Sequence, residues 1–157
     1  MSLRVKDVMV KNVITIGAMS TVRRATELMD KYDLGCLVVV HKDKPIGIVT
    51  ERDLLTRVLL ELRDPRKTRV SSIMSKPLVT AGPETNIHEA VSLMVKQKIK
   101  KLPVIKKGRL RGLVTLTDVV RSSAYFEHAI ASFLQRKCAK CKWRQPKEKT
   151  VMLQSSV

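Results

Sequence analysis

One segment occurs twice in this chain. The run from Gly47 to Asp53 returns 65 residues later as the run from Gly112 to Asp118, and in both runs an apolar stretch leads into a threonine and then an aspartate. The same offset aligns the flanking residues without a gap and pairs Met9 with Met74, for example. Two copies of one unit therefore make up most of the 157 residues, and the fold has to accommodate this duplication.

Each copy shows the same succession of secondary-structure patterns. A brief extended segment is followed by apolar residues at helical spacing behind Ser20 or Thr85, which are favourable N-cap residues. Two β-branched runs around a polar turn then predict a hairpin, and a closing helix begins near Glu51 or Thr117. The predicted strands are residues 13–16, 37–40 and 46–50 in the first copy and 78–80, 102–105 and 110–115 in the second, and short lead-in turns over 5–10 and 70–75 begin the copies.

This succession predicts an α/β (α+β) fold of two β-α-β-β-α units with pseudo-two-fold symmetry. A unit of about 60 residues is marginally stable alone, so we expect the two copies to pack against each other. Apolar residues at helical spacing continue after the second copy, and the chain then becomes basic. The expected parts are the first copy (3–63), a polar linker (64–69), the second copy (70–123), a C-terminal helix (124–136) and a basic tail (137–157).

The composition limits the kinds of partner and the cellular compartment that are compatible with this chain. A net charge of +17 fits a polyanionic partner, an acidic lipid or a nucleotide ligand, and it also fits a solvated surface of lysine and arginine. Three cysteines give no even disulfide framework and indicate a reducing compartment. The apolar runs are too short for a membrane span and the charged start is unlike a secretory signal, so we expect a cytoplasmic protein.

Several short motifs point to one family. Asp7-Val8-Met9 opens the first copy, Ile73-Met74 stands at the matching place in the second, and the run from Lys100 to Val104 begins a strand. Both copies end in Gly-apolar-Val-Thr-x-x-Asp. Over about residues 3 to 123, the chain resembles a tandem pair of cystathionine-β-synthase-type (CBS) domains, known as a Bateman module.

The resemblance implies a regulatory module without catalytic activity of its own. Such modules bind an adenine nucleotide (AMP, ADP or ATP), or in some cases S-adenosylmethionine, at two quasi-equivalent sites in clefts between the copies, and they often form homodimers. No cofactor is implied, and any regulated protein would be a separate chain. The sequence itself contains no phosphate-binding P-loop, dinucleotide-binding glycine pattern, paired-histidine metalloprotease motif or nucleophile elbow.

The aspartates that end the repeated segment are the first candidate ligand-binding residues. Asp53 and Asp118 match the family's aspartate that accepts hydrogen bonds from ribose hydroxyls, a role that suits a carboxylate near a helix start. The alternative for both is a helix cap. Thr15 and Thr80 match positions that line the base and phosphate, and their alternative is an ordinary strand threonine.

Hydroxyl residues just before the aspartates are the second group. Thr50, Thr115 and Thr117 match the family's phosphate-facing hydroxyls. Arg52 replaces the second hydroxyl in the first copy, so we expect the two sites to differ. Arg52 would either strengthen phosphate binding as a forked donor or point to solvent.

Basic residues at a strand start distinguish the second copy. Lys100 and Lys101 match family positions that reach the phosphates, and Pro103 of the same strand start is assigned to the site with them. The first copy has Gly35 and Cys36 at the lysine positions, so the second copy is the better predicted anion site. The alternatives are two surface lysines and, for Cys36, a small buried apolar residue.

The tail suggests a second hypothesis. Cys138 and Cys141 form a CxxC pair, which could share a zinc ion if His128 or a second tail in a dimer completed the site, or could remain free thiols. The basic residues of 137–144 and Trp143 would suit phosphate contacts and one stacking interaction with RNA or DNA. On this alternative, the pair of copies is a dimeric scaffold and the tail binds nucleic acid.

Overall fold

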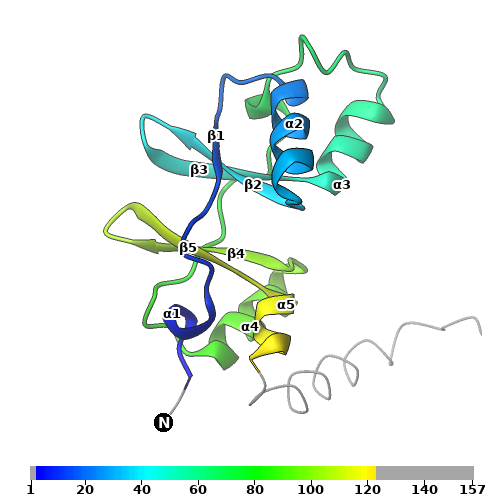
Figure 1. Cartoon of the computed structure of the whole chain (residues 1–157). Coiled ribbons are helices and arrows are strands. Elements are labelled where there is room, and N and C mark those ends of the chain that lie inside the picture. Colours follow the sequence, from blue (N-terminus) through cyan, green and yellow to red (C-terminus); the bar gives the residue numbers. More distant parts are fainter. Residues whose placement is uncertain (1–2, 123–157) are drawn as a thin grey trace, which may run out of the picture.

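Two small units lie one above the other in the computed structural model of the chain (Figure 1). The structure describes residues 3–122, so the expected helix over 124–136 and the tail over 137–157 lie outside the described residues. In each unit the sheet lies toward the middle of the molecule and helices lie toward its outer end (Figure 1). Strands β3 and β5 contact each other between the units.

The described elements follow the predicted succession. The first copy contains β1 (Thr15–Gly17), α2 (Val22–Tyr32), β2 (Cys36–His41), β3 (Lys44–Thr50), α3 (Glu51–Leu54) and the π-helical turn η1 (Leu55–Leu59). The second contains α4 (Ile87–Gln97), β4 (Lys101–Lys106), β5 (Arg109–Thr115) and α5 (Leu116–Arg121). Short helices α1 (Val5–Val8) and η2 (Val70–Ser72) begin the two copies. The α/β fold of two units is therefore confirmed.

The sheets follow the same plan with one difference. Strand β1 is parallel to β2, and β2 forms an antiparallel hairpin with β3. Strands β4 and β5 form the matching hairpin. The predicted strand over 78–80 is wrong, because these residues form no strand and the next residue, Ala81, makes only an isolated bridge to Val104. That bridge is still the 65-residue equivalent of the pair between Ile16 and Val39 in β1 and β2.

The N-caps of the two long helices lie one residue later than predicted. Thr21, rather than Ser20, caps α2 and accepts a hydrogen bond from the Arg24 N–H at 3.2 Å. Asn86, rather than Thr85, caps α4. Thr85 instead accepts a hydrogen bond from the Gly82 N–H, at 3.1 Å, in the turn before the helix. Neighbouring residues of similar capping ability explain the shift.

The first segment of each copy packs on the rest of the other copy. Val5 is fully buried in the core of the second copy, together with Leu102, Val104 and Val114. In the reverse direction, Val70, Ile73 and Met74 are buried in the core of the first copy, whose other members include Leu37, Val39 and Val49.

Backbone pairing shows the same exchange. Val10 pairs with Leu113, and its equivalent Ser75 pairs with Ile48. The backbone N–H of Val10 donates to the Leu113 carbonyl at 2.9 Å, and the Ser75 N–H donates to the Ile48 carbonyl at 2.8 Å. The exchange is therefore reciprocal, which is what a pseudo-two-fold relation between the copies requires.

Candidate functional site

Each repeated segment ends in a strand that turns directly into a helix, and this turn places the predicted aspartate. At the start of α5, the Thr115 N–H and the Thr115 hydroxyl both donate to Asp118 Oδ2, at 2.8 and 2.7 Å. The Asp118 N–H donates back to Thr115 Oγ1 at 3.2 Å. This is a capping box, so the helix-cap interpretation describes one role of Asp118.

The first copy builds the same capping box and adds an ion pair. Thr50 donates through its N–H and hydroxyl to Asp53 Oδ2 at 2.8 and 2.7 Å. Arg57 then lies 3.2 Å from the second carboxylate oxygen, Asp53 Oδ1, and also donates to the Ile73 carbonyl at 2.5 Å. Asp53 is only 6% exposed, so Arg57 compensates the charge of a buried carboxylate.

The two aspartates therefore differ in the oxygen that remains available. Both oxygens of Asp53 already have partners. Within residues 3–122, no donor or basic group reaches Asp118 Oδ1, and Asp118 is half-buried. Position 122, the equivalent of Arg57, is a serine. The second copy thus presents a carboxylate oxygen that could accept a hydrogen bond from a ligand.

The strand ends of the two copies are joined by Lys101. This residue begins β4 opposite Thr115, and its ammonium group donates a hydrogen bond to the backbone carbonyl of Gly35 in the first copy. A Cβ atom added to Gly35 would lie 2.6 Å from Lys101 Nζ and 3.0 Å from Glu51 Oε2. Because Gly35 has no side chain, the ammonium group of Lys101 and the carboxylate of Glu51 can occupy this space.

Cys36 begins β2 beside this junction and is buried. Burial raises the pKa of the Cys36 thiol, with a smaller raising effect from the charge of Glu51, while the charge of Lys101 opposes both. A thiol held in its neutral form is a poor nucleophile and a poor metal ligand. The structure thus agrees with the interpretation of Cys36 as a buried small residue.

The other predicted ligand residues occupy varied positions. Arg52, Thr117 and Lys100 are exposed, and in the described part of the chain none of their side chains has a hydrogen bond or an ion pair. Thr15 and Thr80 are half-buried beside the strand β2 or β4 of their own copy. Pro103 is buried, and its carbonyl accepts a hydrogen bond from the Ala81 N–H at 3.0 Å.

Arg57 and Glu51 are the residues near the predicted sites whose contacts the sequence interpretation missed. Arg57 follows Asp53 by four residues, a spacing that brings oppositely charged side chains together on a helix, so this pair could have been anticipated. The proximity of Glu51 to Lys101 had no such signal, because the two residues belong to different copies.

Residues 3–122 contain neither a candidate metal cluster nor a helix that could span a membrane. In that range no group of three or more His, Cys, Asp or Glu side chains is arranged to hold a metal ion. Cys138 and Cys141 lie outside the described residues, so zinc binding by this pair stays a prediction. None of the described helices has both the length and the apolar character needed to cross a membrane.

The chain is similar to a known domain family and to several known proteins. The profile of the CBS domain matches residues 5–60 and 70–125. The CBS domain-containing protein YhcV of Bacillus subtilis is 34% identical over 115 residues, which are 73% of this chain and 81% of that protein. Inosine-5'-monophosphate dehydrogenase of Methanocaldococcus jannaschii is 33% identical over 121 residues, which are 76% of this chain and only 23% of the enzyme.

A solved structure shares the architecture. The hexameric CBS-CP12 protein from bloom-forming cyanobacteria matches with a TM-score of 0.74 and 31% identity, covering 89% of this chain and 90% of that chain. The matched part of the dehydrogenase is less than a quarter of that enzyme, so this likeness does not extend to the enzyme as a whole.

Proposed function

Because the chain belongs to the CBS-domain family, we propose that it is a non-catalytic regulatory module that binds an adenine nucleotide between its copies and signals to a partner. The observation that carries this proposal is the Oδ1 oxygen of Asp118, which has no partner among residues 3–122 and lies beside an oxygen that the capping box already holds in place. A fixed carboxylate with one free oxygen suits a ribose diol, which donates hydrogen bonds.

The remaining groups near Asp118 suit the phosphates. Thr117 is exposed next to it, and Lys100 is exposed at the start of the strand that pairs with β5. Thr115 already donates its hydroxyl proton to Asp118, so Thr117 is the more available hydroxyl donor. Lys100 would supply positive charge, since Lys101 is engaged with the Gly35 carbonyl.

The first copy is the weaker nucleotide site in this proposal. Its aspartate has no free oxygen because Arg57 occupies Oδ1. Its lysine positions hold Gly35 and Cys36, which carry no positive charge. Arg52 is the remaining basic group near the capping box, and it is exposed. We therefore propose one principal nucleotide site, at the second copy.

Thermal unfolding with AMP, ADP, ATP and S-adenosylmethionine tests the proposal. A ligand at about one hundred times its dissociation constant adds about 2.7 kcal/mol to the free energy of unfolding. For a chain of this size, that raises the melting temperature by about 5 to 10 °C. The Asp118→Asn variant should lose the shift, because asparagine keeps an oxygen for Thr115 and replaces the other with a donor.

Asp53→Asn is the matched control. It changes the equivalent capping box, and we expect it to lower the melting temperature while leaving the nucleotide-induced shift largely intact. The proposal is wrong if none of the four compounds shifts the melting temperature of the unmodified protein. The assignment to the second copy is wrong if Asp53→Asn abolishes the shift and Asp118→Asn does not.

We also propose that the module is a homodimer. The π-helical turn η1 and the turn that follows it expose large apolar side chains: Leu55 (58%), Leu59 (67%), Leu60 (77%) and Leu62 (91%). A row of exposed leucines is costly in water unless another surface covers it, and the CBS-CP12 relative is described as hexameric. Light scattering on the Leu59→Glu/Leu60→Glu variant should show a monomer, whereas an unchanged mass would reject this surface.

A further inference from the structure

The second copy has an unbalanced distribution of charge. Between Glu89 and Asp118 the sequence contains eight lysines and arginines and no acidic residue. In contrast, the α2 helix of the first copy pairs Arg23 and Arg24 with Glu27. The excess positive charge of the second copy is therefore concentrated in one segment, and that segment includes the whole β4–β5 hairpin.

The tip of this hairpin gathers four basic residues. Lys106 and Arg109 are directly opposite each other in the ladder, Lys107 lies in the turn, and Arg111 follows on β5. All four are exposed, and over the described residues none has an ion pair or a side-chain hydrogen bond. Like charges directly opposite each other destabilise a sheet. A bound anion would remove that repulsion.

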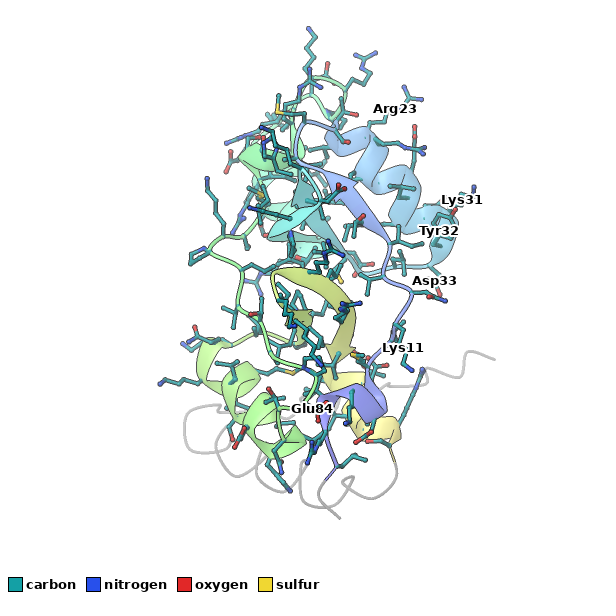
Figure 2. The ribbon with its side chains drawn as sticks, turned by 90° about the vertical axis from the view of Figure 1, so that its left-hand side faces the viewer. Lys11, Arg23, Lys31, Tyr32, Asp33 and Glu84 are labelled. Atoms are coloured by element: carbon teal, nitrogen blue, oxygen red, sulfur yellow. The ribbon has the colours of Figure 1, made fainter. Side chains whose placement is uncertain are left out.

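The first copy repeats the arrangement in weaker form. His41 pairs with Lys44 at the tip of the β2–β3 hairpin, and Lys42 and Asp43 form the turn. All four are exposed, and Lys42 and Lys44 have no ion pair within residues 3–122. Both hairpins project from the same side of the molecule, the left side in Figure 1. Figure 2 views the molecule from that side, with the two hairpins one above the other and pointing toward the viewer.

We propose that the two hairpin tips form one basic surface that binds the phosphate backbone of a nucleic acid. We call it the hairpin surface, and its residues are Lys42, Lys44, Lys106, Lys107, Arg109 and Arg111. It lies away from α3 and α5, where the proposed nucleotide site begins, because those helices start at the opposite ends of the strands (Figure 1). The two sites are therefore separate.

The chemistry of the hairpin surface favours nucleic acid over other anionic partners. The large apolar side chains that are exposed among the described residues are Val10, Met19, Tyr32, Leu55, Leu59, Leu60 and Leu62, and none belongs to a hairpin tip. A membrane-binding surface would need apolar groups to insert, and a protein interface would need aromatic or other large anchors. Unpaired lysine and arginine without stacking rings match backbone recognition, which is independent of base sequence.

Fluorescence anisotropy of the full chain with a labelled DNA duplex, measured over a range of salt concentrations, tests the proposal. The test variant is Lys106→Gln/Lys107→Asn/Arg109→Gln. Asparagine is used at Lys107 because its φ of 53° is in the left-handed region, which asparagine tolerates. We expect the affinity to fall by at least about ten-fold and the slope of log K against log salt to decrease by about 2 to 3, for three lost phosphate contacts.

The matched control removes the same charge from α2 and from the C-terminal end of α4. It is Lys31→Gln/Lys96→Gln/Lys98→Asn, in which Lys98 also has a left-handed φ, of 56°. The control should lose less than about two-fold in affinity. An independent variant of the first tip, Lys42→Asn/Lys44→Gln, should also weaken binding. The melting temperatures of the control and of the first-tip variant, with and without nucleotide, should match that of the unmodified protein. The melting temperature of the Lys106→Gln/Lys107→Asn/Arg109→Gln variant should not fall below it, because this variant loses a pair of like charges.

Three outcomes would overturn the proposal. The first is equal loss of affinity in the hairpin variant and the helix control, which would show a response to net charge alone. The second is unchanged affinity in both hairpin variants, which would place the binding elsewhere, for example in the basic tail over 137–157. The third is binding to vesicles that contain phosphatidylserine without binding to the duplex.

Discussion

The ammonium group of Lys101 in the second copy donates a hydrogen bond to the backbone carbonyl of Gly35 in the first copy. The two residues are 66 positions apart in sequence and join the strand ends at the candidate site. Lys101→Ala should lower the free energy of unfolding by about 1 to 2 kcal/mol, because a charged donor is lost from a half-buried carbonyl. This corresponds to a decrease of about 2 to 8 °C in the melting temperature.

Lys100→Ala is the control for that measurement. Lys100 is exposed, and within residues 3–122 its side chain has no partner. Its removal should change the free energy of unfolding by less than about 0.5 kcal/mol. Equal losses in the two variants would mean that the contact between Lys101 and Gly35 contributes nothing measurable.

Gly112 should be intolerant of alanine. A Cβ atom at this position would lie 2.6 Å from Met9 Sδ and 2.8 Å from the Val10 carbonyl oxygen. The backbone atom cannot move without breaking the pairing of Val10 with Leu113, so we expect a loss of about 1 to 3 kcal/mol in urea unfolding. Gly82→Ala is the control, since its nearest neighbour, Thr85 Oγ1, is 3.5 Å away. A well-tolerated Gly112→Ala would contradict the close packing of the exchanged segment.

Glu84 should make the docking of α1 sensitive to acid. Hydrogen bonds from Lys6 and then Arg4 lower the pKa of Glu84 below its ordinary value of 4.5. Figure 2 shows Glu84 beside α1. A carboxyl group whose pKa is lowered by folding stabilises the folded state above its unfolded pKa, and that stabilisation is lost as the pH falls through the folded pKa.

The titration of Glu84, followed by NMR, checks this prediction. The measured pKa should be below 4.5 in the unmodified protein and should rise in Lys6→Ala. Added salt should also raise it, since these side chains are largely exposed and their interactions are screened. A pKa that is indifferent to both changes would show that the ion pairs do not persist in solution.

Cys36 should resist alkylation in the folded protein. Burial raises the pKa of its thiol above the ordinary value of 9.0, so the reactive thiolate is scarce at neutral pH. Iodoacetamide followed by peptide mass mapping should label Cys36 slowly without urea and rapidly with it. Because folding raises this pKa, the associated stability is present below the unfolded pKa and is lost as the pH rises through the folded value. Rapid labelling of the native protein would contradict the burial.

The fold was largely predictable from the sequence because the pattern of each helix and strand occurs in both copies. The hairpins and the long helices follow local patterns of β-branched and periodic apolar residues, which short-range physics determines. The exchange of Val5 and Val70 between the copies was not predictable from those patterns. A short apolar turn packs equally well on either of two similar cores, and only the three-dimensional path of the chain selects one.

The residues of the candidate site were predictable from the sequence, but the full difference between the sites of the two copies was not. The match of Asp53 with Asp118 predicts two similar sites. Within the repeated segment, the predicted difference between them is Arg52 in place of a hydroxyl residue. The structure shows a further difference, because Arg57 occupies one oxygen of Asp53. The sequence likewise predicts that Lys101 reaches a phosphate. Its hydrogen bond to the Gly35 carbonyl of the first copy could not be predicted from sequence patterns.

The exchange of segments between the copies also determines the order in which this chain can fold during synthesis. Proteins generally fold one domain at a time, beginning with the part that leaves the ribosome first. Here the first copy lacks a portion of its core until Val70, Ile73 and Met74 have emerged. Val5 meets Val114 only after more than one hundred further residues have been added. Neither copy can therefore be finished before the other has begun, and the nascent chain completes its two halves together.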